Sequence, residues 1–215
     1  MYTPSYFRNE DLKTMHATIR RHPFALVVTP FQGELHLTHL PFNLDPARGP
    51  KGTLEAHLAR VNPHCAALKA GAESLVVFRG PDGYISPRWY VDPAKNVPTW
   101  NYVALHVHGV PKPVEEPAAL LALIGRLTDE HEAYIERPWS IREAQAHAER
   151  LTGHILGFEI AIESLEGKFK LSQNRSAGDR AGVMAEFAKS TDTGVGEMLE
   201  LMRGLYRDDG LPAEP

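Results

Sequence analysis

The hydrophobic and polar positions of the chain follow two periods, which together predict a protein that is mainly β with some helix. Residues 24–29 form a continuous apolar run, as in a buried strand. Residues 34–42 alternate apolar and polar positions after a Gln-Gly pair, which predicts a hairpin. The same patterns predict further strands at 52–59, 74–78, 84–86, 99–110 and 154–171. The sequence Gly80-Pro81-Asp82-Gly83 predicts a turn between two of them.

Helices are predicted where apolar residues recur every three or four positions. The first covers about 9–21 with Asn9 as its cap, and a short one begins at Pro63 and ends before Gly71. Further helices are predicted at 118–134, at 139–150 and over about the last forty residues. Because six strands follow one another within about 90 residues through short connections, we expect a closed or nearly closed antiparallel barrel rather than a parallel sheet.

The composition is that of an ordinary globular protein, and it excludes several classes of function. The chain has 215 residues, enough to bury a sizeable core. Its 23 Lys and Arg against 27 Asp and Glu give a net charge of −4, so the chain as a whole lacks the basic footprint of a nucleic-acid-binding protein. The single Cys65 excludes an intrachain disulfide. With neither an apolar run of about 20 residues nor a signal-peptide pattern, we expect a cytoplasmic protein that does not span a membrane.

Two histidine pairs come nearest to a metal-binding pattern. His106 and His108 lie two apart on a predicted strand and face the same side, but they need a third ligand from elsewhere. His36 and His39 lie three apart and face opposite sides. We therefore predict no metal site. The sequence also lacks a glycine-rich phosphate loop and a Gly-x-Ser-x-Gly nucleophile elbow.

Three clusters at predicted strand ends combine aromatic side chains with hydroxyl, amide or cationic groups. They are residues 84–90, 97–102 and 167–175. Cations neutralise a phosphate, polar groups fix the edge of a ring and an aromatic residue covers its face, so this combination suits a flat, phosphorylated ligand. In the alternative reading, Trp89 and Trp100 are core or interface anchors and the basic run is a solvated turn.

Short motifs in a fixed order across residues 1–183 resemble those of the PaiB-type FMN-binding negative transcriptional regulators, a branch of the FMN-binding split-barrel superfamily. They include His22-Pro23-Phe24, Thr38-His39-Leu40-Pro41-Phe42, Gly52-Thr53-Leu54, Asn62-Pro63, Tyr84-Ile85-Ser86-Pro87, Val97-Pro98-Thr99-Trp100-Asn101-Tyr102, Gly157-Phe158-Glu159-Ile160 and Lys170-Leu171-Ser172-Gln173-Asn174-Arg175. The resemblance implies an antiparallel split β-barrel with peripheral helices over 1–183. Residues 184–215 are then a helical extension of the same domain.

The resemblance also implies a homodimer that holds FMN in a groove between the protomers. It makes Arg60 with Asn62, and Ser86 with Arg88, the candidates for the phosphate. The candidates for the ring and the ribityl chain are Trp89, Thr99, Trp100, Asn101, Lys170 and Gln173. Each has a structural alternative: Arg60 pairs with a carboxylate, and Asn62 caps the helix that begins at Pro63.

Two classes of function stay open on the sequence. The family implies a repressor, and direct DNA contact would need a local basic patch, for which 142–150 and 168–180 are the best candidates. The other class is an enzyme: a flavin-dependent oxidoreductase that uses a nicotinamide cofactor or a small substrate. A haem-binding split-barrel protein is a third, weaker alternative.

Overall fold

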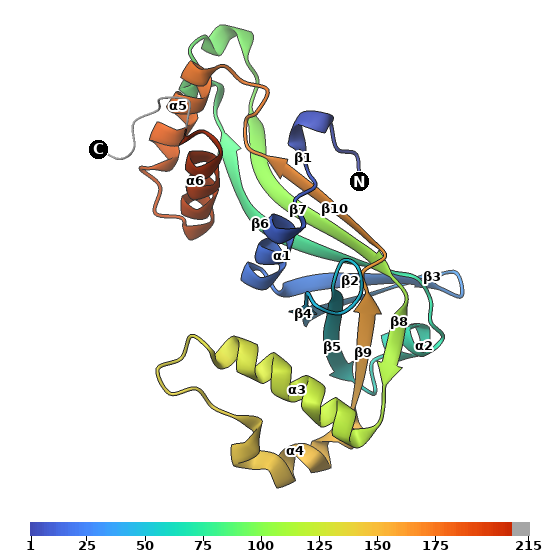
Figure 1. The fold of residues 1–215 in the computed structure, drawn as a ribbon. Helices are drawn as coiled ribbons and strands as arrows, with labels where there is room; N and C mark the ends of the chain where they lie inside the picture. The colour runs from blue at the N-terminus through green and yellow to red at the C-terminus, as the bar shows by residue number, and fades with distance from the viewer. Residues whose placement is uncertain (208–215) are drawn as a thin grey trace. The chain divides into compact units, whose positions relative to one another are not determined.

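The computed structural model describes residues 1–207, and the chain divides into two compact units. Unit 1 consists of residues 1–10, 79–104 and the chain from 166 onward, and unit 2 of residues 11–78 and 105–165. Figure 1 labels the helices and strands of both units. None of the helices within residues 1–207 is long and apolar enough to cross a bilayer.

Unit 2 contains two antiparallel arrangements of strands. In the first, strands β2 (Phe24–Phe31) and β3 (Glu34–Pro41) form a hairpin, and β2 also pairs with the start of β6 (Ser74–Ile85). The second is a four-stranded sheet in the order β4-β5-β9-β8, made of β4 (Asn43–Asp45), β5 (Thr53–Ala59), β9 (Ile155–Ala161) and β8 (Pro111–Val114). The inward side chains of β5 and β9 are fully buried, because alternate residues of a strand face one side.

The helices of unit 2 are α1 (Leu12–Arg21), α2 (His64–Lys69), α3 (Pro117–Glu132) and α4 (Gln145–Leu151), with short 3₁₀ turns at Ile141–Ala144 and Thr152–His154. Helices α1, α2 and α3 bury apolar residues, whereas α4 has no buried residue. Asp11 caps the start of helix α1: its carboxylate accepts a hydrogen bond from the backbone N of Thr14 at 3.0 Å. Helix α3 lies against β5 and buries Leu120 and Leu123 (Figure 1).

Unit 1 contains strands in the order β1-β10-β7-β6, together with two helices. Its strands are β1 (Arg8–Asn9), β10 (Ser164–Lys170), the first part of β7 (Thr99–Gly109) and the last part of β6. Its helices are α5 (Ala177–Phe187) and α6 (Thr193–Leu205), and short 3₁₀ turns lie at Ser5–Phe7, Pro87–Trp89 and Pro93–Lys95. The predicted fold class, mainly antiparallel β with peripheral helices, is confirmed.

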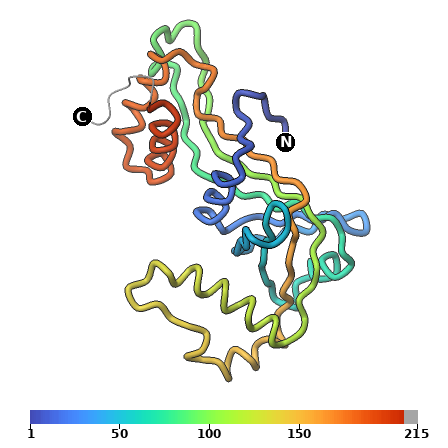
Figure 2. Tube along the Cα trace, in the orientation of Figure 1, coloured from blue at the N-terminus to red at the C-terminus, as the bar shows by residue number. Residues whose placement is uncertain are grey.

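The predicted turn at residues 80–83 is wrong. Strand β6 continues without a break through both glycines and is drawn as one strand in Figure 1; the tube in Figure 2 follows the same path. A Cβ atom at Gly83 would lie 2.7 Å from Cζ of Phe187, and one at Gly80 would lie 2.9 Å from Cβ of Val103. The glycines therefore allow close packing against a helix and a neighbouring strand, rather than a reversal of the chain.

Other boundaries also differ from the sequence predictions. The long strand predicted at 154–171 is two strands, β9 and β10, separated at Ile162 and Glu163. The cap of the first helix is Asp11, because Asn9 lies in β1 opposite Gly167. Sequence patterns missed the short strands β1, β4 and β8. Residues 208–215 of the predicted C-terminal extension lie outside the described residues.

Candidate functional site

Two cations share one carboxylate where β5 leads into α2 in unit 2. Arg60 donates a hydrogen bond to Oε1 of Glu115 at 2.9 Å, and Nζ of Lys69 donates to the same oxygen at 2.7 Å. These bonds, first that of Lys69 and then that of Arg60, lower the pKa of the Glu115 carboxyl. The three side chains are between about one third and one half exposed. Together they carry one net positive charge at a surface that a solute can reach.

Asn62 and His64 lie at the start of α2, beside a chain of buried hydroxyl groups. The side-chain oxygen of Asn62 accepts from the backbone N of His64 at 2.9 Å, so the capping alternative applies to this residue. The two ring nitrogens of His64 lie 2.9 Å from Oγ1 of Thr38 and 2.8 Å from Oγ1 of Thr29. Burial, and then the nearby His36, lower the pKa of His64 to about 4. The imidazole is therefore neutral at physiological pH.

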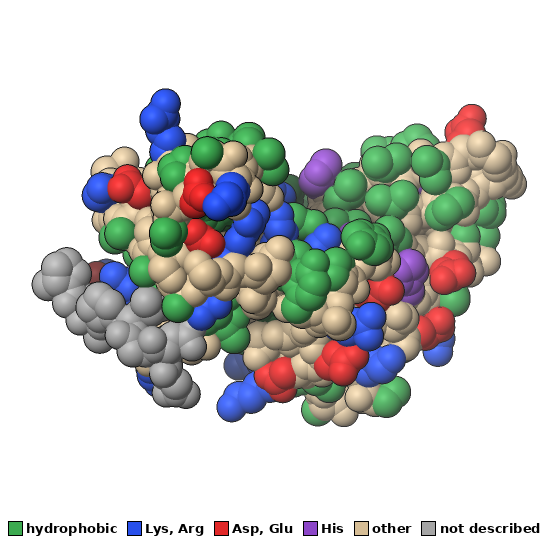
Figure 3. Space-filling view, turned by 90° about the horizontal axis from the view of Figure 1, so that it is seen from above, with side chains coloured by type: hydrophobic (Ala, Val, Ile, Leu, Met, Phe, Trp, Pro, Cys, Tyr) green, Lys and Arg blue, Asp and Glu red, His purple; other side chains and the backbone are tan. Residues whose placement is uncertain are grey.

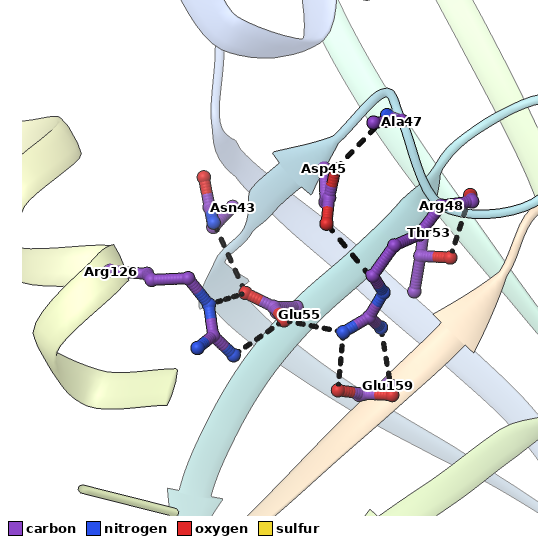
Figure 4. A network of polar contacts seen from close by, with 8 residues as sticks. All are labelled: Asn43, Asp45, Ala47, Arg48, Thr53, Glu55, Arg126 and Glu159. Carbon is purple, nitrogen blue, oxygen red and sulfur yellow. Dashed lines mark hydrogen bonds and ion pairs between the residues drawn. The ribbon is translucent and has the colours of Figure 1, made fainter. Parts of the chain in front are cut away.

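An ion-pair network fixes strand β5 just before this region (Figure 4). The Glu55 side chain is fully buried and accepts from Arg126 at 3.0 and 2.7 Å and from Arg48 at 3.2 Å. Arg48 also pairs with Glu159 on β9 at 2.8 Å. Since a buried carboxylate is stable only when it is paired, the network holds β5, β9 and α3 in one arrangement.

Unit 1 places several of the predicted residues around a group of aromatic rings. Tyr84 lies edge-on to Trp89, with ring centroids 6.4 Å apart, and edge-on to Trp100, at 5.7 Å. Trp89 also contacts Phe187 of α5, at 5.9 Å. Trp100 is 51% exposed and Tyr84 is 45% exposed. Trp89 is thus partly a packing residue, whereas Trp100 presents an open aromatic surface.

Ser86 and Arg88 lie between these rings in the sequence. The hydroxyl of Ser86 accepts from the backbone N of Arg88 at 3.3 Å and caps the 3₁₀ turn Pro87–Trp89. Arg88 is exposed, and no carboxylate within residues 1–207 forms an ion pair with it. Ser86 therefore has a local structural partner, while the Arg88 guanidinium is available to an anion.

The strand ends of β7 and β10 bring together two predicted residues that are distant in the sequence. Nζ of Lys170 donates to Oγ1 of Thr99 at 2.5 Å. The pKa of Lys170 is lowered by burial, and further by Lys168 and Arg175. A lysine in this state binds an anion readily, because an anion would offset both the burial and the repulsion.

Asn101 and Gln173 already have protein partners. Asn101 is 1% exposed and exchanges hydrogen bonds with Ser172 at 3.0 and 3.2 Å. Ser172 has a φ of +68°, an unfavourable conformation for a residue with a Cβ, and this pairing helps to hold it. The Gln173 amide accepts from the backbone N of Leu171 at 2.7 Å and donates to the carbonyl of Phe169 at 2.6 Å. Both amides organise the turn after β10.

The site residues predicted from the sequence did not include Lys168, Arg175 and Tyr90. Lys168 and Arg175 both act on the charge of Lys170, and Arg175 lies over the Tyr90 ring. Nζ of Lys168 lies 5.1 Å from the centroid of the Tyr102 ring, and the Arg175 guanidinium lies 4.6 Å from that of Tyr90. One signal was available: Lys168 and Lys170 are two apart on a strand and so share a face. The contact of Arg175 with Tyr90 joins residues distant in sequence, which no local pattern reveals. Within residues 1–207, no group of three or more His, Cys, Asp and Glu is arranged to hold a metal ion.

Comparison with known proteins places the chain in a family. Residues 1–164 match the family model described as "Putative FMN-binding domain". The chain is also 31% identical over 204 residues to "Protease synthase and sporulation protein PAI 2" of Bacillus subtilis. The matched region covers 94% of this chain and 96% of the relative. The chain belongs to this FMN-binding, PaiB-type family. The resemblance inferred from the sequence motifs is therefore confirmed.

Solved structures agree on the fold of this family member. The FAD and heme binding protein from Mycobacterium smegmatis superposes with a TM-score of 0.59 at 17% identity, over 81% of this chain and 78% of that one. The flavocytochrome Anf3 from Azotobacter vinelandii gives 0.57 at 14% identity, over 78% and 72%. At these identities the likeness concerns the fold, which is the split barrel of flavin-binding proteins. Of the predicted site residues, Lys170 and Gln173 lie beyond the segment that the family model matches.

Proposed function

We propose that this protein binds FMN and acts, as a homodimer, as a negative transcriptional regulator of the PaiB type. Family membership supports a flavin ligand. The observation that carries the choice of a phosphorylated flavin is the cation pair Arg60 and Lys69, which retains one net positive charge after pairing with Glu115. A flavin phosphate carries negative charge and needs such a fixed cation, because a partly buried charge without compensation is costly.

The residues of unit 2 fit this role chemically. Arginine presents a planar fork of donors that suits two phosphate oxygens, and lysine adds a point charge. Asn62 caps α2 with its oxygen, and its Nδ2 makes a 3.4 Å contact with the Thr38 hydroxyl. We assign the phosphate to Arg60 and Lys69, with Asn62 shaping the backbone beside them. Bound FMN would supply redox chemistry or a ligand-dependent signal, and these side chains only bind and orient it.

The predicted ring contacts belong to unit 1, and they are proposed from the surroundings of each residue within that unit alone. Trp100 presents an exposed indole, and Thr99 presents a hydroxyl bound to Lys170. An aromatic face covers a flat ring and a hydroxyl fixes its edge, so these two are the best candidates for the isoalloxazine. Ser86, Trp89, Asn101 and Gln173 have structural partners, and we assign them supporting positions.

The homodimer is supported by an apolar face of unit 2. Leu35 and Leu37 on β3 are 65% and 56% exposed, and Phe24 on β2 is 64% exposed. Leu37 stands opposite Val28 and Phe24 stands opposite Pro41, so Leu35, Leu37 and Phe24 share one face of the hairpin. Strand β3 is also the last strand of its sheet, and an uncovered apolar edge strand promotes association. We assign this face to a second copy of the chain.

Flavin binding and regulation are tested in two steps. Purified protein is titrated with FMN and with riboflavin, and the quenching of flavin fluorescence gives each affinity. We expect FMN to bind more tightly than riboflavin, because only FMN has the phosphate. Equal affinities for FMN and riboflavin would refute the assignment of the FMN phosphate to Arg60 and Lys69. Gel-shift measurements on the promoter of the protein's own gene, with and without FMN, then test repression. If no flavin-dependent shift appears but FMN stimulates oxidation of a nicotinamide cofactor, the oxidoreductase alternative replaces the regulator.

A further inference from the structure

Unit 1 contains a group of cations that is distinct from the Arg60 and Lys69 pair. Lys168 and Lys170 share one face of β10, and Arg175 follows in the turn after the strand. Both lysines have neutral partners: Nζ of Lys168 donates to the carbonyl of Tyr2 at 3.1 Å, and Lys170 donates to the hydroxyl of Thr99. No Asp or Glu in the described part of the chain forms an ion pair with these three cations. On the face drawn in Figure 3, Lys and Arg side chains lie beside hydrophobic ones.

The Arg175 guanidinium is held in place by a hydrogen bond and a ring contact, both to neutral groups. It donates to Oδ1 of Asn96 at 2.7 Å and lies over the Tyr90 ring, 4.6 Å from the centroid. The carbonyl of Arg175 accepts from Arg180 at 2.7 Å, which steadies the turn. A guanidinium fixed in this way keeps its full charge and several of its donors for a ligand.

Tyr90 supplies the second, independent observation. Its side chain is 4% exposed, and its hydroxyl has no hydrogen-bond partner among residues 1–207. Buried hydroxyl groups are almost always hydrogen-bonded, so this one lacks a partner that a bound group would supply. Burial raises the pKa of Tyr90 although Arg175 opposes the shift, so the hydroxyl keeps its proton and can donate it in a hydrogen bond.

The carboxylates nearest to this group are already engaged. Asp179 accepts from the backbone N of Val91 at 2.9 Å, and Asp92 pairs with Lys95 at 2.8 Å. Asp179 keeps its negative charge in the hydrogen bond with Val91 and offsets part of the Arg175 charge, whereas Lys170 has no acidic partner within residues 1–207. A dianionic oxyanion would offset those charges and also accept from the Tyr90 hydroxyl.

We propose that Tyr90, Lys170 and Arg175 form an oxyanion site in unit 1 that binds the phosphate group of a small ligand other than the flavin. Lys168, two residues before Lys170 on the same face of β10, adds to the positive electrostatic potential near Lys170. Lys170 also binds Thr99, the proposed ring contact, but the site stands or falls separately from the flavin phosphate assigned to Arg60. A phosphate matches this site better than a monoanion, because Arg175 lies over the Tyr90 ring and also repels the charge of Lys170, so that two cations and one hydroxyl donor are offered to the ligand.

Calorimetric titration with inorganic phosphate, at constant ionic strength in chloride, tests the site on the full chain. We expect Tyr90→Phe to weaken phosphate binding by about 10-fold and Arg175→Gln by about 10- to 100-fold. Lys189→Gln serves as the matched control, because Lys189 is exposed and already paired with Glu186 at 2.6 Å. It should bind phosphate as the parent does. If Tyr90→Phe and Arg175→Gln both retain the parent's phosphate affinity, the proposal is overturned.

Thermal unfolding provides a second readout that a merely structural role would not give. Without phosphate, Tyr90→Phe should melt at the same temperature as the parent or higher, because it removes a buried hydroxyl that has no partner. With saturating phosphate the order should reverse. A Tyr90→Phe protein that is less stable in both conditions would show that the hydroxyl has an internal partner, against the proposal.

FMN separates this site from the proposed function. If FMN competes with phosphate and riboflavin does not, the site holds the flavin phosphate, and the second-site proposal is overturned. If Arg175→Gln binds FMN as the parent does but loses phosphate, the two sites are separate, as proposed. If FMN does not bind the parent at all while phosphate does, the proposed function fails and this site stands.

Discussion

Two substitutions at one ion pair should change FMN affinity in opposite directions. Arg60→Ala removes one of the two cations that share Glu115, and the remaining Lys69 and Glu115 then form a neutral pair. Glu115→Gln keeps both cations and removes the only negative charge in the group. The phosphate should therefore bind more weakly to the first variant and more tightly to the second. A residue with only a structural role would not give this reversal.

The structure sets the size of each effect. A hydrogen bond to a charged group contributes about 1.5–3 kcal/mol, which corresponds to roughly 10- to 100-fold in affinity. Because the Arg60 side chain is 35% exposed and partly neutralised by Glu115, we expect a loss near the lower end, about 10-fold. Removing an exposed negative charge is a smaller change, so Glu115→Gln should improve FMN binding by about 2- to 5-fold. Losing this exposed pair costs about 0–1 kcal/mol of stability, so both variants should fold.

The assay is fluorescence titration of each protein with FMN and riboflavin, at two salt concentrations. Riboflavin lacks the phosphate, so its affinity should be the same in the parent, Arg60→Ala and Glu115→Gln. Arg79→Ala is the matched control, since Arg79 is an exposed arginine that pairs with Asp82 three residues away. It should change neither ligand's affinity. If Arg60→Ala binds FMN as tightly as the parent does, the phosphate assignment is refuted.

Three further predictions concern assembly and stability. Leu37→Asp places a charge on the exposed face of β3 and should therefore convert the dimer to a monomer, measured by sedimentation at micromolar concentration. A parent protein that is already monomeric would contradict the assignment of that face to a second copy. Stability should fall as pH drops from about 6.5 to about 4, because the unfolded chain protonates His64 before the folded chain does. His64 contributes up to about 3 kcal/mol to this loss, and the His64→Gln protein should lack that contribution in urea unfolding at several pH values. Arg126→Ala removes two hydrogen bonds to the buried Glu55 and should cost about 1–3 kcal/mol in urea unfolding, whereas the exposed Arg142→Ala should stay within about 0.5 kcal/mol.

Local apolar patterns located several strands well: a continuous apolar run predicted β2, and alternation predicted β3, where one face is covered and the other meets water. Strands β2, β3, β5 and β7 all lie within about two residues of their predicted bounds. The turn prediction at 80–83 failed for a long-range reason. Gly80 and Gly83 make room for Val103 and Phe187. The local sequence does not distinguish glycines that form a turn from glycines that allow close packing.

In the candidate site too, contacts between residues close in sequence could be predicted, and contacts between distant residues could not. The capping role of Asn62 could be read from its place beside Pro63, since capping is a local effect. The ion pair of Arg60 was foreseen as an alternative, but its partner Glu115 lies 55 residues away and could not be named. Thr99 and Lys170 were both predicted site residues, yet their contact depends on the pairing of distant strands. The unpartnered hydroxyl of Tyr90 is visible only in three dimensions.

The absorption spectrum of the protein after purification, with mass measurement of any ligand released on denaturation, tests the central claim most directly. We predict a yellow protein, or one that becomes yellow on addition of FMN and stays so through gel filtration. Its spectrum should have the visible bands of an oxidised flavin, and the released ligand should have the mass of FMN. A protein that stays colourless after incubation with FMN, or that carries only a haem Soret band, would contradict the account.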